Sequence, residues 1–388
     1  MTKLNSQTNS TGDIPEQAAG GVLHIDLDAL AANWRTLRDH AGSAETAAVV
    51  KANAYGTGIE KAVPALSQAG CRTFFVAHLS EAIRARAVAP EATIYVLNGL
   101  FTGTSPTYAE HDLRPVLGSF EEIEEWVGFC RAQSRKLKAA IHVDTGMNRL
   151  GLTVQQGLTL KDRGELEDFG NALLMSHFVS AEESDNPLNA QQIEAFEAVR
   201  SSLPDIPASL PNSSGIFLRN KPAYELVRPG YALYGGNPTP SRDNPMRPVV
   251  RLEGRIVQLR WVEAEHTVGY NGRWLALEKR RIATLSVGYA DGYPRAASAR
   301  GKSGEALLAG MALVAGQSCS FAGNVSMDLI TVDVTDVPEG RVKRGDTVTL
   351  IGGELTVDEV GRRAGTIGYE ILTNLGARYA RAYRGGEG

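Results

Sequence analysis

The stretch Thr46-Ala-Ala-Val-Val-Lys-Ala-Asn-Ala-Tyr-Gly-Thr-Gly58 decides how the rest of the chain is interpreted. Residues 46–50 are small or apolar and predict a buried strand. Lys51 follows directly, and Gly56 and Gly58 then break the strand into a loop. Because burial disfavours the ammonium form, a lysine here is expected to have a lowered pKa. A neutral amine is a nucleophile and a base, although a lysine at a strand end is also commonly a snorkelling side chain without a function.

The composition is that of an ordinary globular protein, and it does not indicate a protein that binds nucleic acid or membranes. A chain of 388 residues suggests two to three domains, and its 43% hydrophobic and 22% charged residues are typical of soluble proteins. The net charge of −4 gives no reason to expect nucleic acid or an anionic membrane surface. Cys71, Cys130 and Cys319 lie far apart, which predicts no disulfide framework, no metal site and a cytoplasmic location. No apolar run approaches the roughly 18 residues of a membrane helix.

The pattern of apolar and polar residues divides the chain into three parts. Residues 1–21 are polar and are expected to be a disordered leader. In residues 22–245, short apolar runs alternate with amphipathic, helix-like stretches, which predicts an α/β fold with a parallel sheet. The strand candidates are eight: 23–27, 47–51, 73–77, 93–97, 114–117, 139–143, 172–177 and 207–210. Eight strand–helix units predict a (β/α)8 TIM-like barrel, and a doubly wound open sheet is the alternative, weakened because no GxGxxG follows any strand.

Residues 246–388 have a different pattern. Apolar and polar residues alternate at period two in the runs 249–259, 281–287, 311–314, 328–334 and 346–351. Turn residues separate these runs, so this part is expected to be a mainly β C-terminal domain.

Several chemically active side chains follow the predicted barrel strands. In a (β/α)8 barrel such side chains meet at the carboxyl ends of the strands. Each of these side chains, taken alone, is explained by a structural role, but together on one rim they predict a site. They are Lys51 after the second strand, Arg149 after the sixth, His177 ending the seventh, Asn212 and Ser213 after the eighth, then Arg228, Gly230 and Tyr231.

A lysine that forms a Schiff base needs an aldehyde cofactor, and the usual one is pyridoxal 5′-phosphate (PLP). Its phosphate would be bound by hydroxyls and backbone N–H groups. The candidates for this role are Ser213, the amides near Ser214 and Gly230, and the phenols Tyr55, Tyr231 and Tyr369. His177 could lie against the cofactor ring, and Arg149 could meet its phenolate oxygen.

The motifs, taken together, resemble those of the alanine racemase family. They are 50–56, 144–151, Asn212-Ser213, 227–230, Val268-Gly-Tyr270, Gly288-Tyr-Ala-Asp-Gly292, Ser326-Met-Asp328 and 366–370, and they occur in order from about residue 22 to about residue 383. The resemblance implies a PLP enzyme of fold type III, with a (β/α)8 barrel followed by a β domain.

The resemblance also implies a role for each matched residue. Lys51 would hold PLP and act as one catalytic base, and Tyr270 would be the second base on the opposite face of the substrate. Arg228 would face the pyridine nitrogen, and Arg149 and the Met327 backbone N–H would meet the substrate carboxylate. The remaining positions are Asn212 with the cofactor, and Tyr289 and Asp328 on the substrate side.

The resemblance further implies a homodimer whose active sites are shared between subunits, because Tyr270 lies in the second domain and Lys51 in the first. Three positions depart from the common pattern in ways that affect the supporting residues. His142 stands where many relatives have a carbamylated lysine, Thr57 where the loop often has histidine, and Ser209 where a histidine often supports Arg228; Ser326 also replaces a common cysteine.

The expected activity is the PLP-dependent interconversion of L- and D-alanine by a Lys/Tyr two-base mechanism, serving D-alanine biosynthesis for cell-wall peptidoglycan or D-alanine catabolism. A racemase that also accepts serine or other small amino acids remains an alternative. A PLP-dependent decarboxylase and a non-catalytic PLP carrier are further alternatives. The absence of a Gly-Gly-Gly phosphate loop weakens the first, and the intact second domain with Tyr270 weakens the second.

Overall fold

The computed structural model describes residues 14–203, 205–304 and 308–386. It divides into two compact units: a barrel unit over Asp26–Val249, and a β unit that joins Val250–Arg384 to the residues before Asp26. The expected division after residue 245 lies close to the change of unit at Val249. Of the expected leader, residues 1–13 lie outside the described residues, whereas Glu16–Ala18 forms a 3₁₀ turn.

Eight parallel strand positions form the barrel. The first is β2 (Glu45–Thr46) continued by β3 (Ala48–Val49), and the others are β4 (Thr73–Val76), β5 (Thr93–Val96), β6 (Arg114–Leu117), β7 (Lys138–Asp144), β9 (Gly170–Met175), β10 (Ala208–Ser209) and β11 (Leu226–Val227). The short β8 (Leu152–Thr153) pairs with β7. The ring closes at β11, which pairs with β2, while the Arg228 N–H donates to Pro211 O at 2.9 Å. The predicted (β/α)8 fold is therefore confirmed.

One predicted strand is assigned wrongly. The run 23–27 was expected to be the first barrel strand, but β1 (Gly21–Asp26) pairs antiparallel with β12 (Val250–Val262) in the β unit. In the structure Leu23 and Ile25 are fully buried and His24 between them is not, as in an antiparallel strand with one solvated face. Lys51 consequently follows the first barrel strand rather than the second, and β11 is the eighth.

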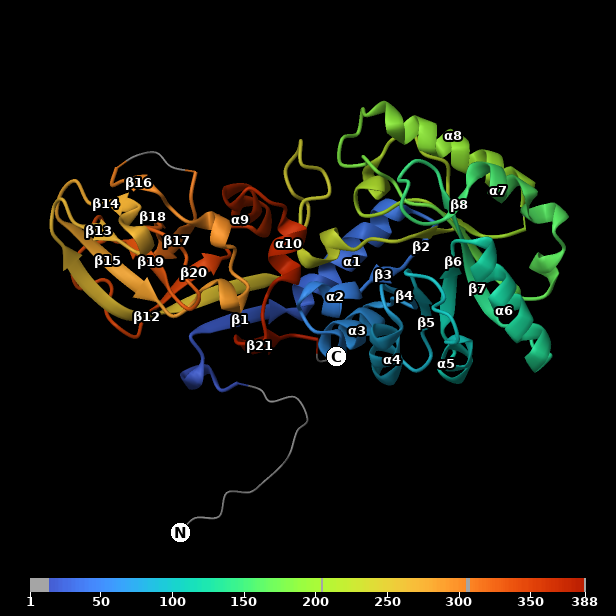
Figure 1. The fold of residues 1–388 in the computed structure, drawn as a ribbon, viewed down its shortest axis with the longest axis horizontal. Helices are drawn as coiled ribbons and strands as arrows, with labels where there is room; N and C mark the ends of the chain where they lie inside the picture. Colours follow the sequence, from blue (N-terminus) through green and yellow to red (C-terminus); the bar gives the residue numbers. More distant parts are fainter. Residues whose placement is uncertain (1–13, 204, 305–307, 387–388) are drawn as a thin grey trace, which may run out of the picture. The chain divides into compact units, whose positions relative to one another are not determined.

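Several helices of the barrel unit begin at a capping side chain. Asp26 accepts the Ala29 N–H at the start of α1, and Ser119 accepts the Glu122 N–H at the start of α6. The helices are α1 (Leu27–Ala41), α2 (Lys51–Tyr55), α3 (Ile59–Ala69), α4 (Leu79–Val88), α5 (Ser105–Glu110), α6 (Phe120–Gln133), α7 (Val154–Thr159) and α8 (Pro187–Ser202). Figure 1 shows β4 to β7 following one another in chain order, with α4 to α6 beside them.

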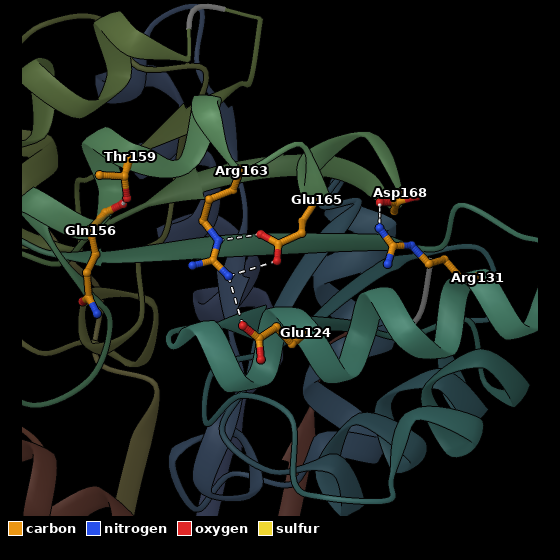
Figure 2. A network of polar contacts seen from close by, with 7 residues as sticks. All are labelled: Glu124, Arg131, Gln156, Thr159, Arg163, Glu165 and Asp168. Carbon is orange, nitrogen blue, oxygen red and sulfur yellow. Dashed lines mark hydrogen bonds and ion pairs between the residues drawn. The ribbon is translucent and has the colours of Figure 1, made fainter.

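A polar network fastens the connection between α7 and β9 to α6 (Figure 2). Arg163 pairs with Glu165 and, at 3.0 Å, with Glu124 of α6, while Arg131 of α6 pairs with Asp168 at 2.7 Å. The Arg163 guanidinium also lies 3.9 Å from the centroid of the Phe120 ring. These contacts hold a loop-rich segment against α6 and involve none of the predicted site residues.

The β unit is organised around the long strand β12. Its first half pairs with β1 and with β20 (Thr347–Ile351), and its second half pairs with β15 (Arg280–Leu285). The other elements are β13 (Thr267–Val268), β14 (Trp274–Leu275), β16 (Gly301–Lys302), β17 (Met311–Val314), β18 (Gln317–Ser320), β19 (Ile330–Asp333), β21 (Ala380–Arg384), α9 (Val357–Ala364) and α10 (Gly368–Thr373). The expected mainly β domain is confirmed. Over the described part of the chain, no helix combines the length and apolar character needed to cross a bilayer.

Candidate active site

Lys51 begins a turn that winds in the left-handed direction, α2. All four residues after it, 52–55, have φ between 50° and 55°. This is unusual for non-glycine residues, because the Cβ of an L-residue then approaches the next carbonyl oxygen at a cost of about 1–2 kcal/mol each. A backbone bond from the Ala54 N–H to Val50 O, 2.9 Å long, helps to close the turn. Strained backbone of this kind is concentrated at functional sites.

The Lys51 amine lies in a largely buried and positively charged neighbourhood. Burial is the main reason that its pKa is lowered, the Arg149 guanidinium lowers it further, and the Glu81 carboxylate opposes both. The expected lowering of the lysine pKa is confirmed. His177 lies nearby, and burial, followed by the charges of Arg228 and Lys51, lowers its pKa to about 3, which keeps the ring neutral. The site thus combines an uncharged ring with an amine whose neutral form is favoured.

Arg228 is buried and held at both of its terminal nitrogens. One donates to the backbone oxygen of Ser209 at 3.0 Å and to its hydroxyl, and the other donates to Ser176 O. Burial lowers the pKa of Arg228 to about 9. Ser209 stands where the family often has a histidine that supports Arg228, and here the serine supports Arg228 instead. His142, on β7, has its pKa lowered to about 4 by burial and then by the charge of Arg228.

Tyr55, Ser213 and Gly230 form a compact cradle beside Lys51. The Ser213 hydroxyl oxygen accepts the N–H groups of Gly230 at 3.0 Å and Ala232 at 3.2 Å. Since both lone pairs of this oxygen are then used, its proton is left to donate elsewhere. A Cβ at Gly230 would lie 2.5 Å from the Tyr55 hydroxyl oxygen, so this close approach requires glycine. The cradle therefore presents at least one hydroxyl donor.

The side chains of two predicted rim residues, Asn212 and Tyr231, contact nearby backbone of the rim segment. The Asn212 side-chain oxygen accepts the Gly215 N–H at 2.8 Å and so organises the loop after β10. Tyr231 is buried at the start of the 3₁₀ turn Tyr231–Tyr234, against Gly236. Both residues support the rim segment that carries Ser213 and Gly230.

In the β unit, Tyr270 is displayed on the surface. Its side chain is 72% exposed, in the 3₁₀ turn Tyr270–Gly272. Gly269, with φ of 79°, precedes it, and the Asn324 side chain donates to Tyr270 O at 3.1 Å. The unit thus holds the backbone at this position firmly while leaving the phenol free of packing.

Two loops of the β unit are joined into one surface that carries Tyr289, Met327 and Asp328. The Tyr289 N–H donates to Ser326 O, and the Ala290 N–H donates to Met327 O, both at 3.0 Å. Arg378 pairs with Asp328 at 2.9 Å. Tyr289 and Met327 are 40% and 54% exposed, so both side chains are available to a ligand. Tyr369 lies on α10 of the same unit.

Sequence reasoning brought together the barrel residues but missed two that organise them. Glu81 accepts the Asn53 N–H at 3.1 Å and so contacts the turn that follows Lys51. Asn53 was given no role of its own in the sequence, although asparagine is among the few residues that readily adopt the left-handed conformation. That preference was a usable signal, whereas nothing local in the sequence connects Glu81 to a loop 28 residues earlier.

Family models match both halves of the chain. The model described as "Alanine racemase, N-terminal domain" matches residues 25–238, and "Alanine racemase, C-terminal domain" matches residues 249–383. An alanine racemase of Methylobacterium sp. strain 4-46 is 58% identical over 364 residues, covering 94% of this chain and 98% of the relative.

Solved structures agree with the family models. The alanine racemase of Bartonella henselae, described with covalently bound pyridoxal phosphate, superposes with a TM-score of 0.88 at 39% identity, covering 94% of this chain and all of that one. The biosynthetic alanine racemase of Pseudomonas aeruginosa gives a TM-score of 0.84 at 35% identity, with 95% and 100% covered. On these similarities over nearly its whole length, the chain belongs to the alanine racemase family.

Proposed function

We propose that this protein is a PLP-dependent racemase that interconverts L- and D-alanine, with Lys51 as the residue that binds the cofactor. The observation that carries the proposal is the largely buried amine of Lys51, with its lowered pKa, on a strained turn at the carboxyl end of a barrel strand. A neutral lysine amine is the form that condenses with an aldehyde. The Bartonella relative, described with covalently bound pyridoxal phosphate, supports the choice of cofactor.

The barrel residues fit PLP on their own chemistry. The Ser213 hydroxyl has a proton to donate, and Gly230 lets the Tyr55 hydroxyl approach closely where a Cβ would collide with it. Tyr55, Tyr231, Tyr369 and the backbone near Gly230 are the further proposed phosphate contacts, with Asn212 organising the loop. When bound, PLP would supply an electron-withdrawing ring that acidifies the α-hydrogen of the amino acid attached to it.

Two bases are required because inversion removes a proton from one face of Cα and returns it to the other. Lys51 is the proposed base on one face and Tyr270 on the other. A phenol with an ordinary pKa of about 10 is a poor base at neutral pH, so Tyr270 must be activated by its surroundings in the assembled site. Neutral His177 would lie against the ring. Arg228 would face the pyridine nitrogen. Its guanidinium would donate a hydrogen bond to that nitrogen without transferring a proton to it.

The substrate would be held by its carboxylate. Arg149 is the proposed side-chain partner, and the backbone N–H of Met327 is the second. Tyr289 would line the entrance, and Asp328, held by Arg378, would lie on the substrate side. His142 cannot carry the carbamate found in relatives with lysine there, so Arg149 must be oriented by other contacts.

The division of these residues between two units, Lys51 in one and Tyr270 in the other, supports a homodimer with shared sites. Mixing inactive Lys51→Ala and Tyr270→Ala chains tests this. Shared sites restore one intact site per mixed dimer, so the mixture should regain up to about a quarter of wild-type activity at statistical exchange. Activity that stays absent after verified subunit exchange would mean that each site is formed within one chain.

We propose a cytoplasmic enzyme that supplies D-alanine for peptidoglycan. The three cysteines are buried and unpaired, which suits a reducing compartment. Two Agrobacterium fabrum relatives, one described as biosynthetic and one as catabolic, are 44% and 43% identical to this chain. Since these values are nearly equal, the biosynthetic role rests on the cellular need for D-alanine rather than on similarity.

The decisive experiment is a racemisation assay with L-alanine, L-serine and larger L-amino acids in the presence of PLP. Alanine should be the preferred substrate, and comparable rates with serine would favour the broader racemase. Borohydride reduction followed by peptide mapping should place the PLP label on Lys51. Protein that binds no PLP and exchanges no α-deuterium from either alanine enantiomer would overturn the proposal.

A further inference from the structure

Glu81 connects two segments of the barrel rim. It is the third residue of α4, and its carboxylate accepts the N–H groups of Ala77 at 3.0 Å and His78 at 3.2 Å, just after β4. Its other oxygen accepts the Asn53 N–H at 3.1 Å. Hydrogen bonds to an ionised carboxylate are stronger than those between neutral groups. One carboxylate therefore fastens the left-handed turn after Lys51 to the end of the neighbouring strand.

A second residue of α4 grips the same asparagine. Arg84, one helical turn after Glu81, donates to the Asn53 side-chain oxygen at 2.6 Å, and that oxygen also accepts the Ile59 N–H at 3.3 Å. Arg84 is held in turn by Glu60 at 2.7 Å. Asn53 is thus fixed both at its backbone N–H and at its side chain, in the middle of the strained turn.

Glu81 also differs in charge from the other groups that act on Lys51. Arg149 and His177 face the same region, and Arg149 favours the neutral amine whereas Glu81 favours the charged one. Among the described residues, Glu81 is the carboxylate that acts on this amine. The same side chain therefore has a geometric and an electrostatic connection to Lys51.

We propose that Glu81 is a positioning residue for Lys51, which holds the left-handed turn in place through Asn53 and fixes the charge balance at the lysine amine. This inference rests on the proposed function in taking Lys51 as the reactive lysine. Glu81 would act on an amine that must react with an aldehyde cofactor. Helix α4 sets the orientation of the Glu81 side chain.

The test compares wild type, Glu81→Gln and Glu122→Gln. Glu122 is a matched control, because on α6 it also accepts backbone N–H groups with both carboxylate oxygens, from Leu100 at 2.8 Å and Gly118 at 2.6 Å, but is not among the groups that act on Lys51. Each full-length protein is freed of PLP, shown to rebind it, and acetylated with trace acetic anhydride between pH 6 and 10. The rate at Lys51 is followed by peptide mass spectrometry.

Glu81→Gln should move the pH midpoint of Lys51 acetylation downward, because the carboxylate that favoured the ammonium is removed, and Glu122→Gln should leave it unchanged. Apparent PLP affinity should fall about tenfold in Glu81→Gln, as expected when a charged acceptor of a backbone N–H is lost. A purely structural role would leave the midpoint unchanged, because the amide oxygen introduced by Glu81→Gln can still accept the Asn53 N–H.

An upward shift, no shift, or an equal shift in Glu122→Gln would overturn the inference. The proposed function fails separately, since it requires that wild-type Lys51 be the residue that PLP labels. A wild-type protein labelled at Lys51 with an unshifted Glu81→Gln variant would refute the role of Glu81 alone.

Discussion

Replacing Ala52 with glycine should stabilise the protein, although glycine usually destabilises a helical segment. Ala52 follows Lys51 with φ of 52° and ψ of 49°, and its side chain is exposed. The substitution therefore removes an unfavourable Cβ contact without removing buried apolar surface. The matched control is Ala198→Gly, at an exposed alanine inside the ordinary right-handed helix α8.

The magnitude follows from two opposing terms. Removing the Cβ from a left-handed residue recovers about 1–2 kcal/mol. The greater freedom of glycine in the unfolded chain costs about 0.4–1 kcal/mol. Ala52→Gly should therefore raise the free energy of unfolding by about 0.5–1 kcal/mol, whereas Ala198→Gly should lower it by about 1 kcal/mol.

Thermal melts of the two PLP-free proteins at matched concentration and scan rate provide the assay. For a unit of roughly 200 residues, 1 kcal/mol corresponds to a shift of about 2–4 °C, so the two variants should melt about 3–8 °C apart. Circular dichroism should show the same secondary structure in both. Equal losses of melting temperature in both variants would refute the left-handed geometry at Ala52.

Three further outcomes follow from the described contacts. The pKa of His142 is lowered from 6.5 to about 4 in the folded state, so the unfolded state binds more protons between these values; stability should fall as pH drops through that window, and His142→Asn should flatten the urea-measured slope by up to about 1.4 kcal/mol per pH unit. Arg163→Ala should cost only about 1 kcal/mol, and part of that loss should disappear in 1 M salt, because its ion pair with Glu124 is exposed while its stacking on Phe120 is not screened. Arg228→Lys should lower the free energy of unfolding by about 2–3 kcal/mol in a urea titration, because a single ammonium cannot serve both Ser209 and Ser176.

The sequence predicted most of the barrel because its strands are buried on both faces and read as short apolar runs. The runs at 73–77, 93–97 and 114–117 correspond to β4, β5 and β6 within one residue. The alternation at period two likewise located β12, β15 and β20. The periodic patterns were reliable because burial on one or two faces constrains every residue of the strand.

The misassigned strand shows where periodicity is insufficient. The run 23–27 has the composition of a barrel strand, but its partner, β12, lies more than 200 residues away in the chain. The strand that closes the barrel, Leu226–Val227, is too short to produce a pattern. The predicted number of barrel strands, eight, was therefore correct, but the run 23–27 was counted in place of Leu226–Val227.

The candidate site was predicted as a set of residue types, whereas its support was not. The predicted strand ends gave Lys51 and His177, because parallel strands deliver their carboxyl ends to one rim. The hydroxyl of Ser209 on Arg228 and the carboxylate of Glu81 on Asn53 come from tertiary contacts. Such contacts leave no local periodic signal, so they could be found only in the folded structure.

The left-handed turn after Lys51 sets an energetic requirement that explains these contacts. The three left-handed residues other than Asn53 cost about 3–6 kcal/mol together, which is comparable to the net stability of a marginally stable domain. The burial of Ala54 and Tyr55 offsets part of this cost, and the charged acceptor Glu81 offsets about 1.5–3 kcal/mol more. A relaxed right-handed turn would need none of these contacts but would direct the chain after β3 differently. The turn is therefore best explained by the placement of the lysine amine, and mutations in α4 should affect that amine without touching it.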